Sequence, residues 1–124
     1  MLLFSHFIEP KLGKERPVLV YNYPIAQAAL AKTSKHEGQS LAKRFELFYK
    51  GIELANGYDE LSDGDEFLKR FFEDEKTRQA YDQPCMSIDP YLLAALDQMP
   101  ECAGVALGLA RLLMLLMDKQ HIDE

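Results

Sequence analysis

Several protein classes are excluded by what the sequence lacks. It has only two cysteines and three histidines among 124 residues, and basic side chains are not in excess. Cys85 and Cys102 match neither a CxxC pair nor a paired zinc signature, so we expect two reduced thiols. The histidines are scattered and have no partner four residues away, which argues against a zinc site or a histidine base. A fold held by disulfides or zinc is therefore not expected.

Neither nucleic-acid binding nor membrane insertion is favoured. Twenty acidic and 14 basic side chains leave a formal net charge of −6, which provides no cationic field for a phosphate backbone. The longest apolar stretch, 104–117, includes Arg111 and is shorter than the roughly 20 residues of a membrane-spanning helix. Residues 1–10 have no basic start and reach Glu9 and Pro10 before a signal-peptide core could form. We expect a cytoplasmic protein without a membrane span.

The first half of the chain reads as β-structure within a single domain. The length suits one domain, and 48% hydrophobic residues suffice for a core. Residues 17–23 are β-branched and aromatic between two prolines, which predicts a buried strand. Residues 44–50 alternate in polarity, and 52–58 begin a second such run. Together they predict an antiparallel hairpin that turns at Lys50 and Gly51.

Helix signals dominate the second half. Phenylalanine and leucine pairs spaced four apart predict a helix over 65–80, and Asp89 followed by Pro90 predicts the start of a shorter one. Residues 103–108 read as a short buried strand. Residues 109–117 read as a helix that is apolar nearly all round, so it must be covered on most sides. The sum is an α+β fold, an antiparallel sheet with flanking helices.

Arg111 stands out in the opening turn of the apolar helix. A guanidinium there costs stability unless an anion meets it. Gly104 and Gly108 precede it in a G-x-x-x-G-x-x-R pattern, and glycines at a helix start let a phosphorylated ligand approach closely. The pattern is neither a P-loop nor a Rossmann turn. A salt bridge at the edge of the core is the alternative interpretation.

The hairpin carries the second cluster of candidate residues. Glu46 and Glu53 lie diagonally on one face, roughly 7 to 8 Å apart, and such a pair can hold hydrated magnesium beside nucleotide phosphates. A solvated strand face is the alternative. Strict alternation places three further side chains on the opposite face: Asn56, Tyr58 and Glu60. One site for all of them requires a bulge or strong twist near Asn56 and Gly57.

These residues resemble a known family. The block RFELFYKGIELANGYDEL, 44–61, is followed about 45 residues later by GVALGLARLLML, 104–115. In this order they resemble the end of the catalytic domain of class II lysyl-tRNA synthetases, and most closely the related elongation factor P lysyltransferase family. The segments LLFSHFIEPKLG and PVLVYNYPIAQAALAK extend the resemblance over nearly all of 1–124. It implies the C-terminal portion of a class II aminoacyl-tRNA synthetase catalytic domain.

The resemblance also implies an activity. Such enzymes condense an amino acid with ATP, in the presence of Mg²⁺, to an aminoacyl adenylate. The lysyltransferase relatives then pass a lysyl or β-lysyl group to a lysine of elongation factor P. The residues that match the ATP-binding and metal-binding positions are Glu46, Glu53, Leu54, Gly108 and Arg111. Among these, the two glutamates would hold the metal and the arginine would be the catalytic contact to the terminal phosphates. The residues that match the amino-acid pocket are Asn56, Tyr58, Glu60 and Ala106.

Two departures from the family pattern temper this expectation. Ala110 replaces the aspartate that usually precedes the signature arginine. The sequence contains nothing like the first two class II signatures, so we expect no amino-acid activation by this chain alone. It contains nothing like an anticodon-binding module and its net charge is acidic, so we expect no direct tRNA binding. A sheet without the N-terminal strands of the family would leave unpaired edges and apolar surface, so we also expect self-association. Ala106 stands where lysyl-tRNA synthetases tend to have glycine, which favours the lysyltransferase relatives. The alternatives are a lysyl-tRNA synthetase fragment, a non-catalytic binding module that kept the fold, and a purely structural interaction domain.

Overall fold

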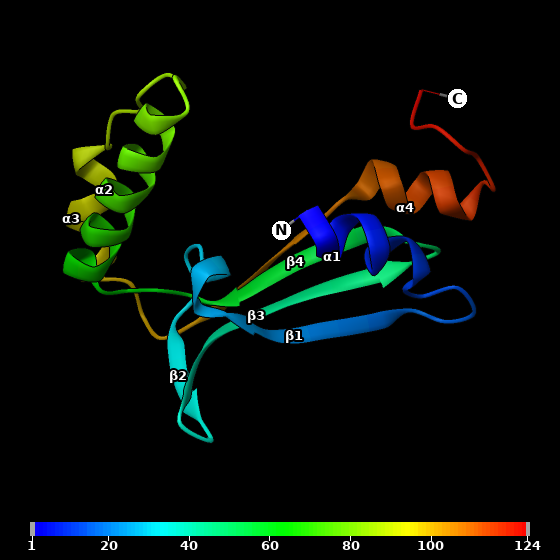
Figure 1. Ribbon diagram of the computed structural model, residues 1–124, viewed down its shortest axis with the longest axis horizontal. Helices are drawn as coiled ribbons and strands as arrows, with labels where there is room; N and C mark the ends of the chain where they lie inside the picture. Colours follow the sequence, from blue (N-terminus) through cyan, green and yellow to red (C-terminus); the bar gives the residue numbers. More distant parts are fainter. Residues whose placement is uncertain (1, 124) are drawn as a thin grey trace.

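The structure is a computed structural model that describes residues 2–123, and it has the predicted α+β architecture (Figure 1). In chain order the elements are α1 (Leu2–Phe7), η1 (Glu9–Lys11), β1 (Val18–Pro24), η2 (Ile25–Gln27), β2 (Thr33–His36), β3 (Gln39–Tyr49), β4 (Ile52–Asp59), α2 (Gly64–Ala80), α3 (Pro90–Leu96), β5 (Ala103–Leu107) and α4 (Leu109–Leu116). The strands pair antiparallel in the order β1-β3-β4-β5, and β2 pairs with the first part of β3.

The β3–β4 hairpin turns where the sequence predicts. Lys50 and Gly51 both have positive φ, 51° and 76°, which is the conformation of a tight two-residue hairpin turn. Phe48 faces Glu53 across the turn, as expected from that centre. The next pair joins Leu47 to Ala55, so Leu54 is an extra residue in β4. The expected bulge is therefore present but lies at Leu54, before Asn56 rather than beside it.

Helix α1 and strand β2 were not predicted from the sequence, nor were the short helices η1 and η2. The short helix α1 lies against the sheet, where the ring of Phe4 makes edge contacts with Tyr23 and Phe48, each at 6.4 Å between centroids. Strand β2 extends the sheet beside β3, which itself begins at Gln39, earlier than the alternation at 44–50 indicates. Both elements lack a strong periodic signal, because each is too short to show one.

Helices α2 and α3 confirm the predicted positions and form an arm at one end of the sheet (Figure 1). Asp63 caps α2 by accepting a hydrogen bond from the Glu66 amide at 2.9 Å. Asp89 caps α3 in the same way, with Pro90 in its first turn, as expected. Cys85 and Cys102 are free thiols, and no helix within 2–123 is long and apolar enough to cross a membrane.

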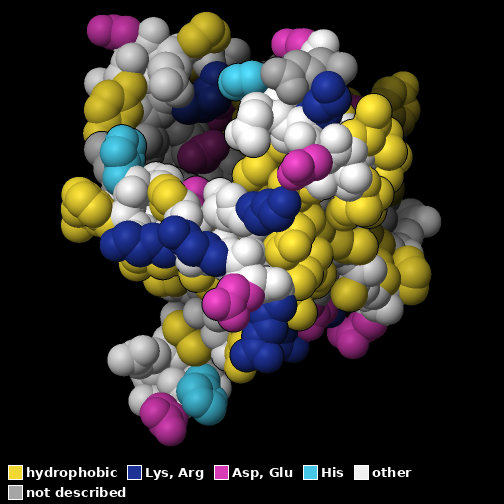
Figure 2. All heavy atoms as spheres, turned by 90° about the vertical axis from the view of Figure 1, so that its right-hand side faces the viewer, with side chains coloured by type: hydrophobic (Ala, Val, Ile, Leu, Met, Phe, Trp, Pro, Cys, Tyr) yellow, Lys and Arg dark blue, Asp and Glu magenta, His cyan; other side chains and the backbone are white. Residues whose placement is uncertain are grey.

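The burial predicted for the outer apolar elements is wrong. Strand β5 exposes 63% of Val105, and α4 exposes 57% of Leu113 and 73% of Leu116, while Met114 alone is buried in that helix. Strand β1 is likewise largely exposed along one face. Figure 2, which faces the end of the molecule that carries α4, shows apolar side chains gathered in one area. Nothing among the described residues packs over this surface, whereas the apolar pattern had implied a cover.

Candidate functional site

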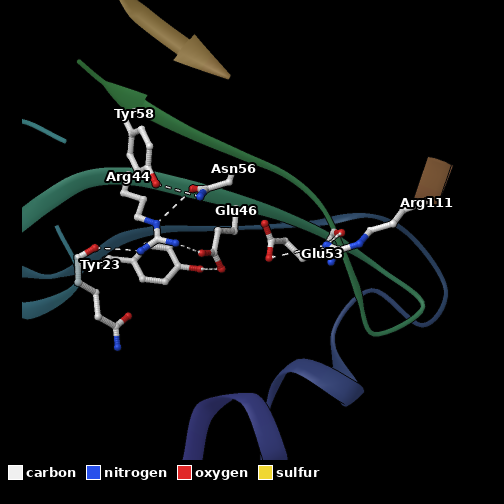
Figure 3. Close-up of polar contacts among 8 residues, drawn as sticks. Tyr23, Arg44, Glu46, Glu53, Asn56, Tyr58 and Arg111 are labelled. Atoms are coloured by element: carbon white, nitrogen blue, oxygen red, sulfur yellow. Dashed lines mark hydrogen bonds and ion pairs between the residues drawn. The ribbon is translucent and has the colours of Figure 1, made fainter. Parts of the chain in front are cut away.

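The bulge at Leu54 brings two sets of predicted side chains to one face of the hairpin. One set is Glu46 and Glu53, and the other is Asn56 and Tyr58. Glu46 pairs with Asn56, and Arg44 pairs with Tyr58, so these side chains share a face by the two-residue alternation of strands. Phe48 and Glu53 also pair on that face. Glu53 and Asn56 are three residues apart and would point to opposite faces in a regular strand, but the extra residue puts them on the same face. The structure thus brings together side chains that strict alternation would have separated (Figure 3). We call this surface the site face.

Glu46 is buried, and neighbouring groups already engage both of its carboxylate oxygens. The Tyr23 hydroxyl donates to Oε2 at 2.6 Å, and Arg44 forms an ion pair with Oε1. Burial, together with the bond to Glu46, raises the pKa of Tyr23 above its ordinary value. Figure 3 shows the Glu46 side chain turned towards Tyr23 and Arg44. Glu46 therefore anchors the site face, with only its remaining lone pairs available for another ligand.

Glu53 is the more accessible of the two carboxylates. About 40% of its side chain is exposed, and no described group donates a hydrogen bond to its carboxylate. Burial of the remainder raises its pKa, and the negative charge of Glu46 adds to this increase. A nearby positive charge would stabilise the ionised form of such a carboxylate. Glu53 is therefore suited to bind a cation, and its side chain is exposed enough to reach one.

Arg111 lies at the end of the site face, next to Glu53. Its Nη1 donates to the Glu53 carbonyl oxygen at 2.8 Å and lies 4.0 Å from the carboxylate. The Gly108 amide donates to the Leu54 carbonyl at 2.8 Å, so the bulge also fixes the start of α4. The Arg111 side chain is 52% exposed, so it is not buried as a helix covered on most sides would imply. Glu53 holds Arg111 although Ala110 supplies no carboxylate.

The predicted amino-acid residues continue along the same face. The Asn56 side-chain amide donates to the Tyr58 hydroxyl at 2.9 Å, and Ala106 pairs with Asn56 on the neighbouring strand. The Glu60 carboxylate lies over Gly104, where a Cβ atom would collide with it. The missing side chain of Gly104 therefore makes room for the Glu60 carboxylate over the sheet.

Arg44 belongs to the site and was missed from the sequence. Its Nε donates to Asn56 Oδ1 at 3.2 Å, its Nη1 donates to the Gln27 carbonyl at 3.0 Å, and its guanidinium lies over the rings of Tyr23 and Tyr58. The signal was present, because Arg44 and Glu46 have the same parity in the strand.

The site face is partly covered, because Phe48 and Glu46 are buried and the Phe4 ring of α1 contacts Phe48 and Tyr23. A hollow of about 790 Å³ lies elsewhere, between η2 and α2, and Arg44 is the one residue of the site that lines it. Within 2–123 no three acidic, histidine or cysteine side chains gather into a metal site. A cation here would therefore be shared between Glu53 and oxygen atoms of a ligand or water.

Comparison with known proteins places this arrangement in context. A family model described as tRNA synthetases class II (D, K and N) matches residues 7–124. The chain is 50% identical over 123 residues to the elongation factor P–(R)-beta-lysine ligase of Haemophilus influenzae (strain PittGG), and 48% identical over 124 residues to that of Pectobacterium carotovorum. The corresponding ligase of Yersinia pestis (strain Pestoides F) is 46% identical. These matches cover 98–99% of the chain but 38% of each relative.

Proposed function

The chain belongs to the class II tRNA synthetase family (D, K and N), and we propose that it forms part of an ATP-dependent ligase that activates lysine or β-lysine for transfer to elongation factor P. One observation carries the proposal. The bulge at Leu54 gathers an accessible carboxylate, an arginine and the candidate amino-acid-binding side chains Asn56 and Tyr58, which is the combination that adenylate formation needs. Such chemistry depends on positioning and charge stabilisation, and no protein nucleophile is required.

The nucleotide end of the site fits ATP and Mg²⁺. Magnesium usually keeps several waters and takes one or two carboxylates besides phosphate oxygens, and Glu53 offers the free carboxylate with Glu46 behind it. Bound magnesium would neutralise phosphate charge. The exposed Arg111 presents a planar fork of donors to the terminal phosphates. Gly108 and Leu54 lie where these two groups meet, and they would border the nucleotide.

The amino-acid end suits a substrate with amino groups. Glu60 supplies a negative charge, Asn56 supplies a hydrogen-bonding amide, and the Tyr58 ring provides an aromatic wall that favours a cation. Ala106 lies beside Asn56, at a position where lysyl-tRNA synthetases tend to have glycine, which supports a lysyltransferase over a lysyl-tRNA synthetase. The contact between Arg111 and Glu53 supports a retained site over a non-catalytic module, because it orients the arginine without the usual aspartate.

The proposal is tested by calorimetric titration of this chain with ATP and magnesium, and then with L-lysine and (R)-β-lysine. Glu53→Gln should abolish the magnesium-dependent part of ATP binding, because it removes the free carboxylate. Glu60→Gln should weaken binding of the amines and leave ATP binding unchanged. Glu73→Gln, on the exposed face of α2, is the matched control. Unchanged magnesium dependence in Glu53→Gln would remove that residue from the site.

Pyrophosphate exchange tests activity separately. Exchange by the chain alone with either lysine, above a heat-killed control, would overturn the expectation that it does not activate amino acids by itself. Where exchange does occur, transfer of the product to elongation factor P, measured against transfer to lysine tRNA, distinguishes the two family alternatives.

A further inference from the structure

Arg44 occupies the centre of the site face, between its two ends. Its side chain is only 12% exposed, and it contacts four separate segments: β1 through Tyr23, η2 through Gln27, its own strand through Glu46, and β4 through Asn56. Glu46 belongs to the nucleotide end of the proposed site, while Asn56 belongs to the amino-acid end. A single guanidinium therefore joins both ends.

The chemistry of the guanidinium dictates how its partners are oriented. Arginine carries only donors, so the Asn56 atom that meets its Nε must be the oxygen. The Asn56 NH₂ group then faces Tyr58, whose hydroxyl oxygen accepts from it at 2.9 Å. Because that oxygen is accepting, the hydroxyl proton of Tyr58 stays available to a ligand. The orientation of two substrate-facing groups thus follows from one buried donor.

A lysine would not reproduce this arrangement. The guanidinium is a planar fork whose Nε, Nη1 and Nη2 each address a different acceptor, and its flat surface lies over two tyrosine rings at 4.9 and 5.7 Å from their centroids. An ammonium group is a compact point charge on a flexible stem. It would still neutralise Glu46, but it would not hold the Gln27 carbonyl and the Asn56 oxygen at the same time.

We propose that Arg44 is the positioning residue of the site, fixing the Asn56 amide and the Glu46 carboxylate in the orientation that the substrates meet. The inference rests on the proposed function for what those groups bind. It adds a residue that acts through others, because the Arg44 side chain is largely buried and its hydrogen bonds and ion pair go to the groups that it orients.

The test uses the two asparagines of the chain, Asn22 and Asn56. With ¹⁵N-asparagine labelling, NMR spectra show two side-chain NH₂ groups, and Asn22 is exposed, so it is an internal reference. In the unmodified chain, hydrogen exchange of the Asn56 NH₂ should be at least tenfold slower than that of Asn22. Arg44→Lys should raise the hydrogen-exchange rate of the Asn56 NH₂ group at least tenfold, while the circular dichroism spectrum remains that of a folded protein. Lys43→Met, which removes the neighbouring exposed cation, should leave it unchanged.

Equal exchange of the two asparagines in the unmodified chain would overturn the inference, even if no Arg44 variant folds. So would an Asn56 rate in folded Arg44→Lys that equals the original one, since a merely structural ion pair would be satisfied by lysine. Titration of the labelled chain with L-lysine and (R)-β-lysine separates the two proposals. Absence of a shift at Asn56 counts against the proposed function, while the exchange rates still decide the role of Arg44.

Discussion

Tyr23→Phe removes one buried hydroxyl group and should destabilise the chain far more than removal of an exposed tyrosine hydroxyl would. The ring and its contact with Phe4 remain, but the buried Glu46 Oε2 loses its donor at 2.6 Å. A hydrogen bond to a charged group contributes about 1.5 to 3 kcal/mol. For a chain of this length that corresponds to a fall in Tm of roughly 5 to 15 °C. Urea unfolding followed by circular dichroism measures the free energy directly.

Tyr21→Phe is the matched control. Tyr21 lies two residues earlier on the same strand and is 69% exposed, so loss of its hydroxyl should change the unfolding free energy by less than about 0.5 kcal/mol. A double-mutant cycle with Glu46→Gln should give a coupling energy of about 1 to 3 kcal/mol, because both changes act on one bond. Equal effects of Tyr23→Phe and Tyr21→Phe would refute the view that Glu46 is anchored through Tyr23.

Further predictions follow from other contacts. Because the pKa of Tyr23 is raised, the stabilisation by its protonated hydroxyl should be present below about pH 10 and lost as the pH rises above that. Tyr23 should then stay protonated in the folded chain near pH 10, so an ultraviolet titration there should give the same amplitude for the unmodified chain and for Tyr23→Phe. The pKa of Glu53 is also raised, so Glu53→Gln should be more stable than the unmodified chain to urea at pH 7, and the difference should vanish below about pH 4. Gly13→Ala should cost about 2 kcal/mol or more in the same assay, because φ is +67° and the new Cβ would lie 2.5 Å from a carbonyl oxygen of β3; Gly38→Ala, at φ +80° with open space around it, should cost less. Sedimentation should show concentration-dependent self-association that Leu113→Lys weakens, and a strictly monomeric chain at high concentration would contradict this.

The sequence predicts those parts of the fold that depend on short-range patterns. The turn at Lys50 and Gly51 follows from local signals, and it correctly places Phe48 opposite Glu53. The start of α3 follows from its capping residue Asp89, whereas the capping residue of α2, Asp63, was not predicted. The position of the bulge could not be predicted from local signals, because it depends on contacts with β5 and α4. The Gly108 amide, which is distant in sequence, donates a hydrogen bond to the Leu54 carbonyl.

The candidate site residues came from the family resemblance, whereas their organisation came from the structure. The family resemblance identifies Glu46, Glu53 and Asn56, and the structure places them on one face. The resemblance did not identify Arg44, since its role appears only when β1, η2 and β4 converge on it. The burial of α4 was overestimated, because an apolar pattern shows only that a helix could pack against an apolar surface. The described residues provide no surface that covers most of α4.

The extra residue in β4 has a consequence for how this sequence can change. Deletion of Leu54 would preserve the hairpin turn and the Phe48–Glu53 pair, yet it would rotate every later side chain of the strand by half a turn. Asn56 and Tyr58 would then point away from Glu46 and Arg44. The interval of two residues between Glu53 and Asn56 is therefore a fixed count. Substitutions within it are compatible with the arrangement, whereas a change in its length would take the two halves of the site apart.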